Sequence, residues 1–226
     1  MKAEVILTAG FASTKHQVER TSKRLSEYLD KDVEGINYTD ALAKNRAFFD
    51  GRDFIITHSG GINALDRPGI RADQIIAIAP PVPQSMTELI VRGFHKLRQC
   101  EGQFEAGFRQ SSAYEGCRHL ARSVKQIHEL SRVSCFTLAQ RLASNGSDIT
   151  IAMMSDDGLF DYHTPHAEDD WFDIGGRVHV KEIAGDHLRF TNEPIAVMRD
   201  IALASTLMVP RFVDSRPADS LLRLAS

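Results

Sequence analysis

The chain has 226 residues, 42% of them apolar, and a formal net charge of −3. This apolar content can fill a sizeable core, which excludes global disorder, and the length suits one α/β domain with an insertion or two small domains. The slightly acidic balance argues against a dedicated nucleic-acid binder, and no apolar stretch approaches the roughly 20 residues of a membrane-spanning helix.

Strand and helix patterns alternate in the first third of the chain. The β-branched apolar run from Val5 to Leu7 predicts a strand, and Thr14 with Gln17 fits a capping box that begins a helix. The next elements in chain order are a strand at 33–38, a short helix at 41–49, a strand at 54–57 and a strand at 75–79. Because alternating strands and helices favour parallel pairing, we predict a mostly parallel sheet flanked by helices.

The pattern changes between residues 84 and 145, where apolar residues repeat at helical spacing. We predict three or four helices inserted between two strands of the sheet. The alternation resumes with strands at 149–154 and 178–183, and Asn192 with Pro194 predicts the start of a final helix. The expected division is a core of residues 1–83 and 146–226 and a helical insertion of residues 84–145.

The most informative motif is Thr57-His58-Ser59-Gly60-Gly61, which follows the apolar run that ends at Ile56. The glycine pair suits a sharp turn from strand to helix, and a serine on such a turn projects its hydroxyl clear of the sheet edge. This geometry is the nucleophile elbow, G-x-S-x-G, here with Thr57 in place of the first glycine. A branched side chain is tolerated there if it points away from the crowded turn. We expect His58 to be a packing residue of the elbow, with a catalytic part as the alternative.

Two more polar sites follow predicted strands. Asp156 and Asp157 come after the strand at 149–154, and His187 comes after the strand at 178–183. The crevices outside the carboxyl ends of parallel strands are where open α/β sheets bind ligands. A serine becomes a nucleophile when a base and an orienting acid reach it, so we expect Ser59, an aspartate and His187 to meet there.

The order serine, acid, histidine resembles that of the α/β-hydrolase fold family. The resemblance covers most of the chain, and the helical insertion stands where that family often carries a cap. The matching segments are residues 67–81 after the nucleophile helix, Asp157-Gly158-Leu159-Phe160 at the acid turn, Gly185-Asp186-His187 at the histidine loop, and Asn192-Glu193-Pro194 at the closing helix. The resemblance implies an α/β-hydrolase core with a helical cap.

The resemblance also implies catalytic roles. Ser59 would be the nucleophile, His187 the general base and then acid, and Asp157 the carboxylate that orients His187. Asp156 remains an alternative for the acid, and Asp161 is close in sequence.

The negative oxygen of a tetrahedral intermediate needs preorganised donors. The backbone N–H of Gly60 is one candidate. The resemblance implies Phe11 as the second donor, with Ala12 as its alternative.

These residues predict a serine hydrolase that cleaves a carboxylic ester of a small-molecule substrate through an acyl-enzyme on Ser59, without a cofactor or a metal. Cleavage of a thioester or an amide, or acyl transfer, would use the same triad. A binding module that keeps the fold without turnover is another alternative, for which Thr57 leaves room. A metal-dependent hydrolase would use His163 and His166, but we expect their loop to be a solvated acidic segment.

The three cysteines, Cys100, Cys117 and Cys135, are odd in number and form no C-x-x-C pair. Reduced structural thiols in a cytoplasmic protein are therefore expected. The apolar run near the start is short, and Glu4 interrupts its beginning, so we do not expect a cleaved secretory signal. The sequence leaves the oligomeric state open, a homo-oligomer included.

Overall fold

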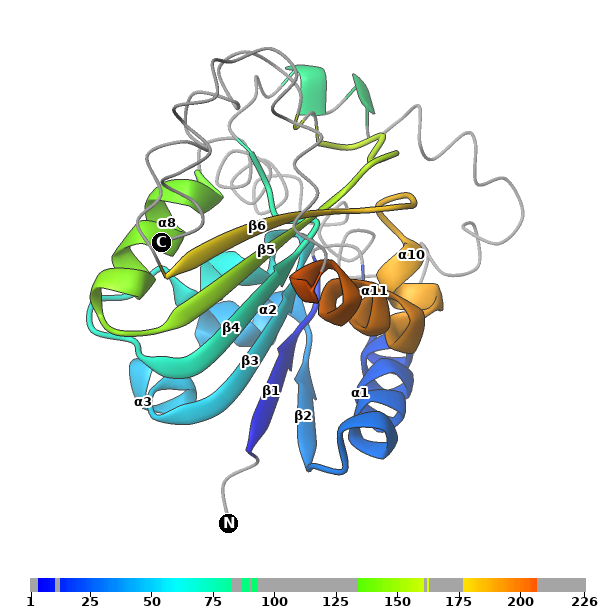
Figure 1. Ribbon diagram of the computed structural model, residues 1–226. Helices are drawn as coiled ribbons and strands as arrows, with labels where there is room; N and C mark the ends of the chain where they lie inside the picture. The colour runs from blue at the N-terminus through cyan, green and yellow to red at the C-terminus, as the bar shows by residue number, and fades with distance from the viewer. Residues whose placement is uncertain are drawn as a thin grey trace.

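The computed structural model describes residues 4–10, 13–82, 87–89, 91–92, 134–160, 162 and 177–206. Within these residues, one parallel sheet has the strand order β2-β1-β3-β4-β5-β6 (Figure 1). The strands are β1 (Val5–Thr8), β2 (Val33–Ile36), β3 (Arg52–His58), β4 (Ala72–Ile78), β5 (Asp148–Met154) and β6 (Val178–Ile183). The predicted parallel sheet is confirmed, and each predicted strand forms with small differences at its ends.

Helices cover both faces of this sheet (Figure 1). One face carries α1 (Lys15–Leu29), α10 (Arg189–Asn192) and α11 (Pro194–Thr206), and the other carries α2 (Tyr38–Ala43), α3 (Arg46–Phe49) and α8 (Cys135–Ser144). Within the part of the chain that the structure describes, no helix combines the length and the apolar character needed to cross a bilayer.

Two cores lie on the two faces of the sheet because successive strand residues point to opposite sides. In β3, Ile55 joins the core under α2 and α8, whereas Ile56 joins the core under α1 and α11. In β4, Ile75 and Ile76 divide in the same way. Both faces of the central strands are therefore buried, which explains why these strands are continuous apolar runs in the sequence.

The first helix begins at the predicted capping box. The Thr14 hydroxyl accepts a hydrogen bond from the Gln17 N–H at 3.1 Å, and the Gln17 side chain accepts one from the Thr14 N–H at 2.9 Å. These bonds satisfy two backbone donors that the first helical turn leaves unpaired. The prediction of the capping box is confirmed.

Two helix predictions differ from the structure in detail. The helix expected at 41–49 forms as two short helices, because the backbone of Lys44 is extended between α2 and α3. Asn192, expected to cap the last helix, instead ends α10, since its N–H donates to the carbonyl of Leu188. Pro194 does begin α11, where its missing N–H costs no hydrogen bond.

The predicted insertion, residues 84–145, lies mostly outside the described residues. Its last part is α8, which packs against β5 and β6. Phe136, Leu138 and Leu142 of α8 are buried in the core under that face of the sheet. These side chains therefore pack on the sheet. The division into 1–83, 84–145 and 146–226 stays a prediction.

Candidate active site

The turn after β3 holds Ser59 in an unusual conformation. Its φ is 53°, in the left-handed region that residues with side chains rarely adopt. The chain continues directly as η1 (Ser59–Leu65), a 3-10 helix. Such a backbone costs about 1–3 kcal/mol and persists only where the surroundings enforce it. The sharp strand-to-helix turn expected from the sequence is therefore present, and it lies at the carboxyl end of a central strand.

Two glycines allow the close backbone approaches that hold this turn. A Cβ on Gly61 would lie 2.5 Å from the carbonyl oxygen of Thr8, and a Cβ on Gly10 would lie 2.8 Å from the Cβ of Ser59. Thr57, where the motif usually has a glycine, is fully buried. Its hydroxyl makes a long hydrogen bond of 3.5 Å to the carbonyl of Ile76 on β4. The branched side chain is thus directed at the neighbouring strand and not into the turn.

Ser59, His187 and Asp157 form a continuous hydrogen-bonded series. Nε2 of His187 is 2.9 Å from Oγ of Ser59, and Nδ1 of His187 is 2.8 Å from Oδ2 of Asp157. Because a carboxylate can only accept, Nδ1 carries the proton and Nε2 accepts from the serine hydroxyl. The side chains of His187 and Asp157 are 8% and 1% exposed, so the series is shielded from water.

The Asp157 carboxylate is held by several donors. Its Oδ1 accepts from the N–H groups of Leu159 at 2.8 Å and Phe160 at 3.0 Å, and the Tyr162 hydroxyl is 3.4 Å from Oδ2. Burial alone would raise the pKa of Asp157, but the charge and hydrogen bond of His187, together with the two amides, outweigh burial and lower it. Asp157 is therefore ionised at neutral pH and suited to orient an imidazole.

The other aspartates near this site have different partners. Asp156 is exposed, and its carboxylate accepts from the Ser155 hydroxyl at 3.1 Å. Asp186 accepts from the Leu188 N–H at 3.0 Å, as expected of a turn residue. Asp161 lies outside the described residues. Among the aspartates that the structure describes here, Asp157 is the one that contacts the imidazole of His187.

Backbone hydrogen bonds tie the acid turn to the histidine loop. The N–H of Asp156 donates to the carbonyl of Gly185 at 3.0 Å, and the N–H of Ser155 donates to the carbonyl of Ile183 at 2.9 Å. After β6 the chain leads to α10 and α11, which pack with α1 (Figure 1). Because β6 is the edge strand and β3 is central, the loop between β6 and α10 has to pass the ends of β5 and β4 to bring His187 to Ser59.

Sequence reasoning missed two partners of this site. Nε2 of His58 lies 2.9 Å from the backbone oxygen of His187, 129 positions along the chain. The Tyr162 hydroxyl donates to the carbonyl of Pro80 at 2.8 Å and lies beside Asp157. Burial raises the pKa of Tyr162 well above its ordinary value, and the Asp157 charge adds to this. No local motif marks either contact, because each depends on how distant loops meet.

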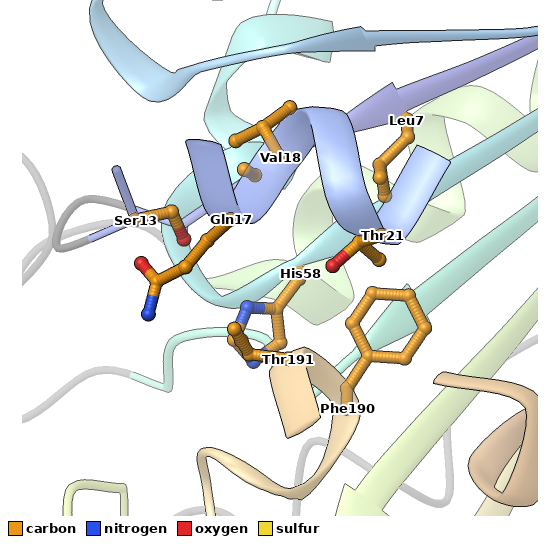
Figure 2. A pocket seen from close by; sticks show the side chains of 9 residues that line it. Leu7, Ser13, Gln17, Val18, Thr21, His58, Phe190 and Thr191 are labelled. Carbon is orange, nitrogen blue, oxygen red and sulfur yellow. The ribbon is translucent and has the colours of Figure 1, made fainter. Parts of the chain in front are cut away.

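A small cavity of about 10 Å³ lies behind the His58 ring (Figure 2). The residues that line it come from β1, α1, β3 and α10 and the chain beside them: Leu7, Ala9, Ser13, Gln17, Val18, Thr21, His58, Phe190 and Thr191. A space of this size is at the lower limit for one water molecule. It is therefore too small for an organic substrate.

The predicted oxyanion donors are described only in part. Gly60 directly follows Ser59 and is buried in η1. Phe11 and its alternative Ala12 lie outside the described residues. Gly10, the residue before Phe11, lies against Ser59.

In the described part of the chain, no group of three or more His, Cys, Asp or Glu side chains is arranged to hold a metal ion. His163 and His166, the ligands of the metal alternative, lie outside that part.

No protein-family model matches the chain, and comparison with curated proteins gives no significant match. Solved structures do match. A hydrolase from Oleispira antarctica has a TM-score of 0.55 at 13% identity, over 90% of this chain and 91% of that chain. A carboxylesterase structure from Nitrososphaera gargenis has a TM-score of 0.56 at 14% identity, over 89% of each chain. NosK from Streptomyces actuosus has a TM-score of 0.57 at 17% identity, over 90% and 98%.

These similarities extend over almost the whole length of each chain and agree with the parallel six-stranded sheet. The protein therefore has the α/β-hydrolase fold. The predicted parallel sheet flanked by helices and the resemblance to this fold are both confirmed, whereas the inserted helical cap stays a prediction.

Proposed function

We propose that this protein is a serine hydrolase that cleaves a carboxylic ester of a small molecule through an acyl-enzyme on Ser59. The observation that carries the proposal is the buried series in which His187 lies 2.9 Å from the Ser59 hydroxyl and 2.8 Å from the Asp157 carboxylate. A serine hydroxyl is a weak nucleophile at neutral pH, and an adjacent oriented base is what activates it.

The proposed reaction has two half-reactions. As Oγ of Ser59 attacks the ester carbonyl carbon, Nε2 of His187 takes the hydroxyl proton and the carbonyl electron pair moves to oxygen. Collapse of the tetrahedral intermediate breaks the bond to the alcohol, which leaves with the proton from His187. Water then attacks the acyl-enzyme in the same way and releases the acid. The ionised Asp157 stabilises the imidazolium that forms in each half-reaction.

We propose that the backbone N–H groups of Gly60 and Phe11 stabilise the negative charge that develops on the carbonyl oxygen. Gly60 supports this assignment because it follows the nucleophile directly, and Gly10 supports it because it brings the chain before Phe11 against Ser59. A donor of this kind is worth about 3 kcal/mol in the transition state. We propose that a cap within residues 84–145 closes over the bound substrate. The cytoplasmic localisation expected from the sequence is also part of the proposal.

Labelling with a fluorophosphonate probe tests the proposal. The probe should modify the wild-type protein on the peptide that contains Ser59, as located by mass spectrometry. Ser59→Ala should abolish labelling, and His187→Ala should slow it by orders of magnitude, whereas Ser144→Ala on α8 is the matched control and should label at the wild-type rate. Labelling that persists in Ser59→Ala would remove Ser59 as the nucleophile. An inert wild-type protein would favour a binding module.

A substrate panel then distinguishes the alternatives that share this triad. Turnover of p-nitrophenyl esters should exceed turnover of matched acyl thioesters and anilides if the protein is an esterase. A preference for thioesters or amides, or transfer of the acyl group to an added alcohol or amine, would change the assigned reaction and leave the acyl-enzyme in place.

A further inference from the structure

We propose that His58 is a positioning residue for His187, and that it fixes the backbone of the proposed general base by donating a hydrogen bond from Nε2 to the His187 carbonyl oxygen. The bond is 2.9 Å long and buried. The inference rests on the proposed proton transfer by His187, which gives this placement its catalytic meaning. His58 itself has no assigned contact with the reacting atoms.

The direction of this hydrogen bond follows from its partner. A backbone carbonyl can only accept, so Nε2 of His58 must carry a proton. The ring is 3% exposed, and burial, helped by the nearby His187, lowers the pKa of His58 to about 4. At neutral pH the ring is therefore uncharged, with one N–H group, and that group is the donor to His187. A neutral ring also avoids placing a second positive charge 5.2 Å from the imidazolium that forms during catalysis.

Because His58 directly precedes Ser59, this bond fixes the distance between the nucleophile and the base. His58 and Ser59 are consecutive residues at the end of β3. His58 binds the backbone of His187, and Ser59 binds its imidazole, each at 2.9 Å. His187 lies outside the helices and strands, in the loop between β6 and α10. Attachment at two points, the end of β3 and the start of η1, therefore defines where this loop residue lies relative to the serine hydroxyl.

Packing limits the motion of the His58 ring. The ring lies near the rings of His187 and Phe190, with centroid separations of 5.2 Å and 5.4 Å. Figure 2 shows the ring between side chains of α1 and α10, beside the water-sized cavity. The cavity is lined by apolar side chains such as Leu7 and Val18 as well as by polar ones such as Gln17. The donor is thus held in one direction.

Three variants separate positioning from packing. His58→Gln keeps an N–H donor close to the place of Nε2, and His58→Phe keeps the ring volume but has no donor. His179→Gln is the matched histidine control, since His179 is exposed on β6. The readouts are kcat and KM for the best p-nitrophenyl ester, the rate of fluorophosphonate labelling, and the low-field proton resonance of the His187 Nδ1–H bond to Asp157.

We expect His58→Phe to lower kcat and the labelling rate by about 10²-fold with KM unchanged, because a shift of the base by about 1 Å has that effect. His58→Gln should recover most of this loss and keep the low-field resonance, which should broaden or vanish in His58→Phe. The His179→Gln variant should match the wild type in every readout. If His58→Phe does not fold, His58→Asn replaces it, since its amide lies near Nδ1 and is too short to reach the His187 carbonyl.

Two results would overturn the inference. One is wild-type kcat in His58→Phe, or in His58→Asn where it replaces that variant. The other is an equal loss of kcat in His58→Gln and in His58→Phe, or the His58→Asn variant that replaces it, with the low-field resonance unchanged in both. Failure of the proposed function is recognised separately, by labelling that survives in Ser59→Ala. The resonance reports the His187–Asp157 bond without any turnover, so it tests the positioning role in either case.

Discussion

Moderate acid should destabilise this protein through His58. In the folded state burial lowers the pKa of His58 from 6.5 to about 4. Between pH 4 and pH 6.5, His58 is therefore protonated in the unfolded chain and neutral in the folded chain. The contribution of neutral His58 to the free energy of unfolding is fully present above pH 6.5 and is lost as the pH falls towards 4. The difference between the two pKa values corresponds to about 3 kcal/mol, a large part of the stability of a typical domain.

The assay is urea denaturation followed by circular dichroism at several pH values from 4 to 8. The wild-type free energy of unfolding should fall by up to about 3 kcal/mol from pH 7 to pH 4, and the curve of His58→Phe should be much flatter in that window. His179→Phe is the control and should keep the wild-type slope. Asp157 acts in the same direction but at lower pH, because its folded pKa lies below its ordinary value of 3.8. Parallel curves for wild type and His58→Phe between pH 4 and 6.5 would refute the reasoning.

Three further substitutions test the site and its support. Gly61→Ala places a Cβ 2.5 Å from the Thr8 carbonyl oxygen, so we expect a loss of about 1–3 kcal/mol in urea denaturation; an unchanged midpoint would contradict this. Asp157→Asn should lower kcat by roughly 10⁴-fold because an amide favours the wrong imidazole tautomer, with little change in Tm; ester turnover within tenfold of wild type would reject Asp157 as the orienting acid. Thr14→Ala should cost about 1 kcal/mol in urea denaturation through loss of the α1 cap, and a neutral effect would speak against the capping box.

Features that depend on neighbours in the chain could be predicted from the sequence. The strands were recognisable because both faces of a parallel sheet are buried, which requires apolar runs such as 54–57 and 75–79. The capping box needs only Thr14 and Gln17, one turn apart. The turn at Ser59 needs a strand followed by small residues. Local prediction failed where a single residue changed the path, as at Lys44, whose extended backbone divides one expected helix into two.

Features that join distant segments were decided by the tertiary structure. Asp156 and Asp157 are the same residue type at neighbouring positions, so the sequence could not separate them. The conformation of the turn determines that Asp157 contacts the Leu159 and Phe160 amides and His187. The assignment of α8 to the core depends on the side of the sheet on which the chain returns. The sequence by itself determined that a serine, an aspartate pair and a histidine each follow a strand, since local patterns suffice for that. Which of them touch was decided by the path of the chain, because a hydrogen bond such as that from His58 to His187 needs both ends placed within 3 Å although they are 129 positions apart.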